Sequence, residues 1–108
     1  MPNKRYRLYP KAIGDLESIY SYSISEFGIK RTEDYILAIQ TSFQHLAEDP
    51  LISRTCDYVR QNLRAFNIGS HIIFFKITSY GIAVIRVLHQ SMDFGAWFKS
   101  SEHSPCFS

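Results

Sequence analysis

The sequence predicts an α+β domain in which a helical hairpin packs on one face of a small antiparallel sheet, with elements in the order β-α-α-β-β-β. Residues 71–78 and 82–88 are two apolar runs of strand-favouring residues, joined by a short turn and free of proline. Residues 10–48 instead carry apolar side chains at spacings of three and four, interrupted by a glycine that can end a helix. Helices and strands therefore occupy different parts of the chain, as is typical of α+β folds.

The N-terminal part predicts a short strand followed by the two helices. Residues 4–9 alternate basic with apolar side chains, a pattern typical of a strand with one buried face. Pro10 suits the first turn of a helix, Gly28 suits the end of that helix, and Asp49-Pro50 ends the second one. Two amphipathic helices joined by a single glycine should pack as an antiparallel hairpin. The apolar stripes expected to form its core-facing side are Ile13, Leu16, Tyr20, Ile24 and Phe27, then Thr32, Ile36, Ile39, Phe43, Leu46 and Ala47.

The remaining chain predicts a surface loop and three strands. Residues 51–61 are polar and aperiodic, residues 62–68 form a strand, and Gly69-Ser70 makes a tight turn into the apolar hairpin. Both faces of that hairpin are apolar, and two helices can shield only one of them. The second face is covered either by the chain itself or by a partner protein. Strict alternation places Ile72, Phe74, Lys76 and Thr78 on one face of the first strand, and Ile82, Val84, Arg86 and Leu88 on one face of the second.

Composition limits the class of protein. The 108 residues, 45% of them hydrophobic, suit one domain over residues 1–94 followed by a tail over residues 95–108. The N-terminus lacks a signal peptide and no run approaches a membrane span, so a cytoplasmic protein with two free thiols is expected. The net charge of +2 does not by itself indicate nucleic-acid binding, and sequence-specific DNA binding is not expected.

Signatures of catalysis are sparse. The four histidines lack metal-ligand spacing, and the chain has neither a glycine-rich phosphate loop nor a G-x-S-x-G motif, so no metal and no cofactor are expected. Four polar residues interrupt apolar strands, namely Arg64, Lys76, Arg86 and His89. Arg64 and Lys76 can extend their charges into solvent at strand edges. Arg86 lies mid-strand, where a charge is costly unless it is paired or functional, and His89 suits a structural hydrogen bond as well as catalysis.

Several of these stretches resemble the ParE toxins of the RelE/ParE superfamily. The resemblance covers residues 4–94, and its most specific part is the RVLH-x-x-x-D element at 86–93. The other matching stretches are NLRAFNIG at 62–69, GSHIIFFK at 69–76 and, in the first helix, Ala12, Asp15, Leu16 and Ile19. The resemblance implies a RelE/ParE-like fold with a helical hairpin on a small antiparallel sheet. It also implies the toxin of a type II toxin–antitoxin module, often described as a plasmid stabilisation protein and neutralised by a cognate antitoxin.

The resemblance leaves two activities open, and a third alternative is an antitoxin-binding scaffold that has lost toxicity. ParE members inhibit DNA gyrase and block replication, whereas RelE members are ribosome-dependent messenger ribonucleases. A nuclease needs a general acid or base and cations near the phosphate, and the candidates are Arg64, Lys76, Arg86 and His89. Trp97 and Phe98 stand where RelE-like nucleases carry a tyrosine or histidine. This difference favours a gyrase inhibitor, for which no catalytic residue is expected. The antitoxin is expected to cover the second sheet face, with Arg86 paired to one of its carboxylates. The residues predicted to contact antitoxin or target are Ile72, Phe74, Lys76, Val84, Arg86, Leu88, Trp97 and Phe98.

Overall fold

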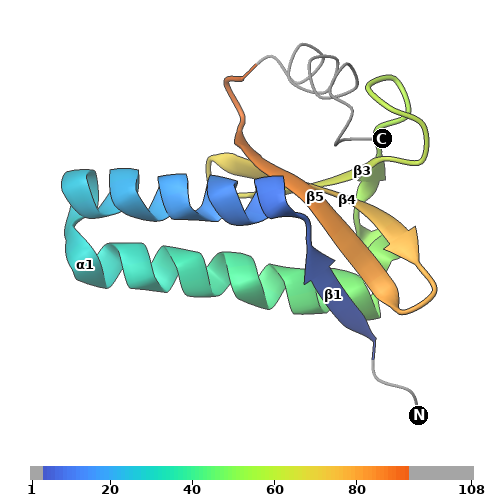
Figure 1. The fold of residues 1–108 in the computed structure, drawn as a ribbon, viewed down its shortest axis with the longest axis horizontal. Helices are drawn as coiled ribbons and strands as arrows, with labels where there is room; N and C mark the ends of the chain where they lie inside the picture. The colour runs from blue at the N-terminus through green and yellow to red at the C-terminus, as the bar shows by residue number, and fades with distance from the viewer. Residues whose placement is uncertain (1–3, 93–108) are drawn as a thin grey trace.

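A computed structural model describes residues 4–92 and confirms the α+β fold. It has a helical hairpin on one side and a five-stranded sheet on the other (Figure 1). The elements are β1 (Arg5–Leu8), α1 (Pro10–Glu48), a 3-10 turn (Pro50–Ile52), β2 (Arg54–Thr55), β3 (Arg64–Ile68), β4 (His71–Thr78) and β5 (Gly81–His89).

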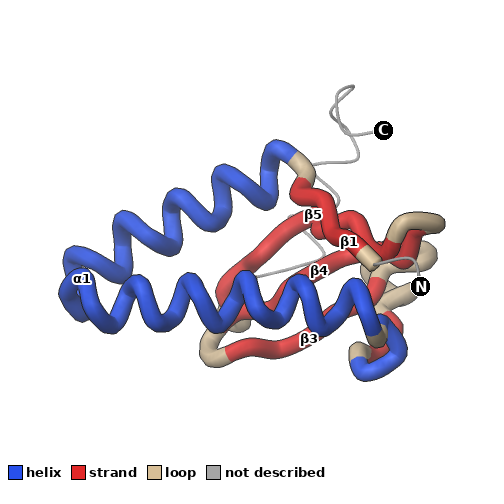
Figure 2. The backbone as a smooth tube through the Cα atoms, turned by 90° about the horizontal axis from the view of Figure 1, so that it is seen from below, coloured by secondary structure: helices blue, strands red, loops and turns tan. Residues whose placement is uncertain are grey.

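α1 consists of two helical arms separated at Gly28. This residue has φ 84° and ψ 170°, values outside the helical region that glycine adopts without a steric penalty. The hydroxyl of Thr32 donates a 2.8 Å hydrogen bond to the Gly28 carbonyl and so supports the start of the second arm. The arms run in opposite directions and meet at a turn that projects beyond the strands (Figures 1 and 2). The predicted helical hairpin is therefore confirmed. Among residues 4–92, no helix combines the length and the apolarity needed to cross a membrane.

The sheet has the strand order β1-β5-β4-β3-β2 and is mixed. The chain neighbours β3, β4 and β5 are antiparallel as predicted, but β1 runs parallel to β5. No tight turn links β1 to β5, because the helical hairpin and three strands lie between them, so local sequence does not fix their relative direction. β2 is a second addition, since its two residues fall within the predicted surface loop and pair with β3.

The main core lies between the helical hairpin and the sheet. Ile39 and Phe43 are fully buried there, and the Tyr6 ring lies 5.2 Å from the Phe43 ring. The second arm buries the predicted stripe, apart from Ile36, which is partly buried. The first arm does not: Ile13 and Phe27 are 46% and 54% exposed, and its buried residues are Ala12, Ile19 and Ser23. The small side chains of Ala12 and Ser23 permit a close approach of this arm to the sheet. The predicted stripe consisted of large residues and so did not indicate this packing.

A second apolar cluster fills the other face of the sheet. It contains Cys56, Leu63, Ala65, Ile72, Phe74, Ile85 and Leu88, with Tyr9 and Val59 packed against it. Of the two alternatives for this face, the chain covers it itself, and the expectation that the antitoxin covers it is wrong. Cys56, in the predicted surface loop, and Leu63, in the predicted strand over residues 62–68, are both buried on this face, and a 2.8 Å hydrogen bond from the Cys56 amide to the Leu63 carbonyl joins them.

A β-bulge in β5 breaks the predicted alternation. Phe74 pairs with Arg86 and Phe75 pairs with Val84, which leaves Ile85 as the extra residue. Val84 consequently belongs to the core under the helices, whereas Leu88 belongs to the second cluster. The prediction that these two residues share one face is wrong, because counting by twos assumes an uninterrupted strand.

Candidate functional site

A largely buried ion pair joins α1 to β5. Asp15 accepts two hydrogen bonds of 2.8 Å from Arg86, and its Oδ2 atom also accepts one of 2.9 Å from the Val87 amide. The two side chains are only 13% and 8% exposed. β1 ends at Leu8, opposite Val84, so the following part of β5 has no neighbouring strand on that side. Asp15 therefore satisfies both the β5 backbone and the charge beside it.

This contact corrects the role expected for Arg86. The guanidinium was expected to pair with an antitoxin carboxylate, but the chain supplies its own carboxylate in a bidentate geometry. Arg86 is also only 7% exposed. A buried arginine that is already paired has a structural role, and it is poorly placed to hold a substrate phosphate.

The four candidate nuclease residues do not converge. Arg64 donates hydrogen bonds of 2.8 and 2.9 Å to the side chain and backbone of Ser53. Lys76 lies over the Tyr9 ring, with 5.6 Å between its ammonium nitrogen and the ring centre. Lys76 pairs with Ala83, whereas His89 lies six residues further along β5. At about 3.3 Å per residue, these two positions are about 20 Å apart.

Four of the eight predicted binding residues lie in the core. Ile72, Phe74, Val84 and Leu88 are between 0% and 3% exposed, so they are core residues rather than contact residues for a partner. The second cluster and the bulge account for this difference. Lys76 remains exposed. Trp97 and Phe98, like the rest of the tail, lie outside the described residues.

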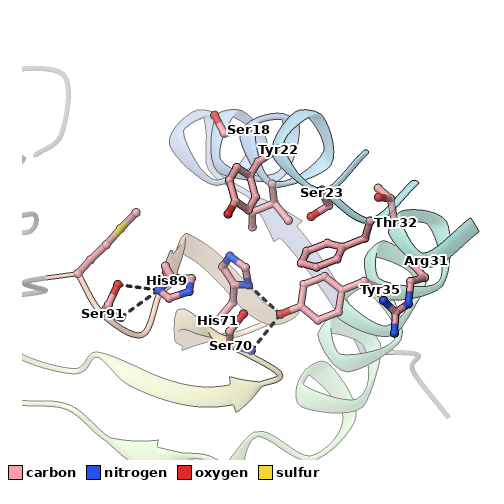
Figure 3. Close-up of a pocket in the computed structure, with 13 residues that line it drawn as sticks. Ser18, Tyr22, Ser23, Arg31, Thr32, Tyr35, Ser70, His71, His89 and Ser91 are labelled. Carbon is pink, nitrogen blue, oxygen red and sulfur yellow. Dashed lines mark hydrogen bonds between the residues drawn. The ribbon is translucent and has the colours of Figure 1, made fainter. Parts of the chain in front are cut away.

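A pocket of about 800 Å³ lies between the projecting helical hairpin and the ends of β4 and β5 (Figure 3). Both arms and both strand ends contribute to its wall. The lining residues are Ser18, Ile19, Tyr22, Ser23, Phe27, Arg31, Thr32, Tyr35, Ser70, His71, His89, Ser91 and Met92. Of the residues predicted as functional that lie within 4–92, only His89 is among them.

Tyr35 and His71 form the polar centre of this pocket (Figure 3). The Tyr35 hydroxyl lies 2.7 Å from Nδ1 of His71 and 3.1 Å from the Ile68 carbonyl, and it accepts a 3.2 Å hydrogen bond from the Ser70 amide. When the single hydroxyl proton goes to Ile68, Nδ1 of His71 must carry the proton that it donates to Tyr35. Nε2 of His71 is then an acceptor.

His89 lies beside His71, with ring centres 5.3 Å apart and the rings nearly perpendicular. Nδ1 of His89 accepts a 3.1 Å hydrogen bond from the Ser91 amide and lies 2.7 Å from the Ser91 hydroxyl. A neutral His89 therefore carries its proton on Nε2. Burial, followed by the neighbouring His89, lowers the pKa of His71 below its ordinary value of 6.5, while Asp15 acts in the opposite direction.

The pocket does not present a metal-binding set. Within residues 4–92, no three His, Cys, Asp or Glu side chains lie close enough together to hold an ion. In its neutral form, Nε2 of His89 holds a proton where a metal ligand needs a lone pair. The histidine pair is suited instead to hydrogen bonding and to proton transfer with a bound group.

Sequence reasoning missed Tyr35 and His71 as partners. They are 36 residues apart, and only the return of the second arm over the start of β4 brings them together. One signal was present: Tyr35 follows Thr32 by three residues and precedes Ile39 by four, so it lies on the buried stripe of its helix. A tyrosine on a core-facing stripe needs a partner for its hydroxyl.

Comparison with known proteins identifies the family. The profile described as the ParE toxin of the type II toxin–antitoxin system parDE matches residues 6–94. The chain belongs to the ParE toxin family. Toxin ParE1 of Mycobacterium tuberculosis is 38% identical over 92 residues, which cover 84% of this chain and 94% of that protein. Toxin ParE1 of Caulobacter vibrioides is 34% identical over 90 residues, which cover 83% and 93%.

A solved structure supports the fold of this ParE toxin. A chain of the chromosomal ParDE toxin–antitoxin system from P. aeruginosa superposes with a TM-score of 0.70, covering 82% of this chain and 98% of that chain. The identity is only 14%, so this likeness concerns the fold alone. The expected ParE membership is confirmed, and the chain is a toxin of a type II toxin–antitoxin system.

Proposed function

We propose that this ParE toxin inhibits DNA gyrase in the cytoplasm as a protein ligand, without cutting RNA, and that a cognate antitoxin neutralises it. Family membership supports the toxin role. The observation that carries the choice of mechanism is the separation of the four nuclease candidates, of which Arg86 is paired to Asp15 and Arg64 is bonded to Ser53. General acid–base cleavage requires these groups around a single phosphate.

Two parallel assays test this proposal. Purified toxin is added to gyrase supercoiling reactions, and separately to ribosomes translating a messenger RNA. The proposal expects inhibited supercoiling and intact messenger RNA, with His89→Ala leaving the RNA result unchanged. Ribosome-dependent cleavage by the wild type that disappears in His89→Ala would establish the ribonuclease instead.

One observation favours that second candidate. His71 and His89 are adjacent in a pocket that also holds Tyr35 and Arg31, and the pKa of His71 is lowered. An imidazole pair in a pocket that also contains an arginine can act as acid and base on a phosphodiester. His71→Ala therefore belongs in the translation assay together with His89→Ala. The structure offers these two histidines as nuclease candidates in place of the set expected from the sequence, of which only His89 remains.

The rim of the pocket is the surface we propose for the antitoxin. Tyr22 and Phe27 are 64% and 54% exposed and both line the pocket, next to the polar centre at Tyr35. Exposed aromatic side chains around a concave site are characteristic of protein-binding surfaces. An amphipathic antitoxin segment can place apolar side chains there without displacing the second cluster.

A further inference from the structure

The charges of the described chain are segregated between helix and sheet. α1 carries six carboxylates and three Lys or Arg residues, whereas the rest of residues 4–92 carries eight Lys or Arg residues and two aspartates. The formal net charge of +2 conceals this separation. Any anionic partner will therefore be drawn to the sheet and not to the helical hairpin.

Strand register gathers three of these cations on one face. Arg7 and Lys76 are both partners of Ala83, so they flank it in a single row across β1, β5 and β4. Ala83 is small and buried, and Arg5 lies one row further along β1. Tyr6 and Leu8 pack under the helices, which directs Arg5 and Arg7 to the opposite side. We call Arg5, Arg7 and Lys76 the basic face.

Aromatic rings orient two of these cations, Arg7 and Lys76, and no carboxylate of residues 4–92 forms an ion pair with any of the three. The Arg7 guanidinium lies 5.0 Å from the centre of the Tyr80 ring, and Lys76 lies over Tyr9. All three cations are exposed, and none of them forms an ion pair with another residue in the 4–92 range. Strand geometry separates neighbouring members by about 7 to 10 Å, comparable with the screening length at physiological salt. Their fields therefore add.

We propose that the basic face binds the phosphate backbone of duplex DNA without reading its sequence. This inference rests on the proposed function, because gyrase holds the DNA that the toxin would meet. Duplex DNA presents about one charge per 1.7 Å of axis, so several phosphates face a patch of this size. An acidic protein partner fits less well, since protein interfaces centre on an apolar anchor and the basic face consists of cations.

The test measures the affinity of purified toxin for a fluorescent 25-base-pair duplex across a salt series, alongside gyrase inhibition. Arg7→Gln/Lys76→Gln removes two charges from the basic face. Lys30→Glu changes the net charge by the same amount at the distant helical hairpin, where Lys30 pairs with Asp34. The proposal expects the double variant to bind DNA about 200-fold more weakly at 50 mM salt, with a salt slope smaller by about 2. Lys30→Glu should bind as the wild type does.

The outcomes separate this proposal from the gyrase proposal. Wild-type binding that does not depend on salt, or a double variant that binds DNA like Lys30→Glu, overturns the basic face as a DNA site. If the double variant loses gyrase inhibition but keeps its DNA affinity, the DNA-binding proposal is overturned in favour of an acidic protein surface. If the wild type binds duplex RNA more tightly than duplex DNA, the proposal is overturned in favour of RNA. Salt-dependent DNA binding by a toxin that does not inhibit gyrase retains the basic face and rejects the gyrase target. Arg7→Lys/Lys76→Arg should restore the salt slope and so exclude misfolding as the cause of a loss.

Discussion

Asp15 and Arg86 are 71 residues apart in the sequence and are joined by two hydrogen bonds of 2.8 Å. The pair connects the first arm of α1 to the part of β5 that extends past β1. Asp15 also accepts a hydrogen bond from the Val87 amide, and so it supplies the acceptor that a neighbouring strand would otherwise provide at this edge of the sheet. The contact thus fixes the helical hairpin on the sheet next to the pocket, since His89 is three residues beyond Arg86.

Removing Asp15 should destabilise the fold strongly. Asp15→Ala leaves a buried guanidinium without its partner, which typically costs about 3 to 5 kcal/mol. The double variant Asp15→Ala/Arg86→Met removes the buried charge and should recover much of that loss. Urea unfolding measures both values, and a loss below about 1 kcal/mol in the single variant would show that solvent reaches Arg86.

Phe43 should be among the most costly residues to truncate. It is fully buried between the second arm and the sheet, so Phe43→Ala should lower the free energy of unfolding by about 3 to 5 kcal/mol. Leu37 lies on the same arm but is 61% exposed, and Leu37→Ala should change stability by about 0.5 kcal/mol or less. Similar losses in the two variants would contradict the packing of the second arm.

Two glycines should respond to alanine with opposite signs. Gly81 has φ 144°, and an added Cβ would lie 1.9 Å from the Arg5 carbonyl oxygen, so Gly81→Ala should disrupt the pairing of β1 with β5. The backbone strain alone costs about 1 to 3 kcal/mol. Gly14 lies within the first arm with no atom within 4 Å of an added Cβ, so Gly14→Ala should stabilise by about 0.5 to 1 kcal/mol. Thermal unfolding of the two variants tests the difference in sign.

The pH dependence of stability should reflect His71. Its pKa is lowered in the folded protein, so below its ordinary value of 6.5 the unfolded chain binds the proton more readily. The contribution of neutral His71 to the free energy of unfolding is complete above about pH 6.5, and it is lost as the pH falls through the lower pKa of His71 in the folded state. Unfolding free energies at pH 7.5 and 5.5 should differ more in the wild type than in His71→Gln. Equal differences would show that His71 titrates normally.

The rim of the pocket should govern antitoxin affinity. Tyr22→Ala/Phe27→Ala removes two exposed aromatic side chains and should weaken antitoxin binding by about tenfold or more, since aromatic anchors carry much of the energy of protein interfaces. Leu51→Ala is the matched control, because Leu51 is 73% exposed and lies away from the pocket. Calorimetric titration with the antitoxin measures both variants, and equal affinities would place the antitoxin on another surface.

Local sequence patterns predicted the helical hairpin and the three consecutive strands, because spacing, Gly28 and short turns determine these features between neighbours in the chain. The same patterns could not show that β1 runs parallel to β5 or that Ile85 is a bulge, since both depend on contacts between distant segments. Because of this bulge, Val84 and Leu88 lie on opposite faces of the sheet and not on one face as predicted.

The candidate site was predicted less well than the fold. The sequence marks Arg86 as an unusual charge within an apolar strand, but it does not show that the partner is Asp15, because the two residues are 71 positions apart. His89 was identified, whereas Tyr35 and His71 were not, because the contact between them exists only after the second arm folds over β4. Charge segregation was also missed, because net charge averages over the whole chain.

The bulge also determines where β5 can lose a residue. Ile85 has no partner in β4, so a chain lacking this one residue could keep every other pair from Thr78–Gly81 to His71–His89. A deletion elsewhere in the paired part of β5 would instead force a partner change or turn side chains to the wrong face. Length differences between relatives of this toxin should therefore concentrate at this position.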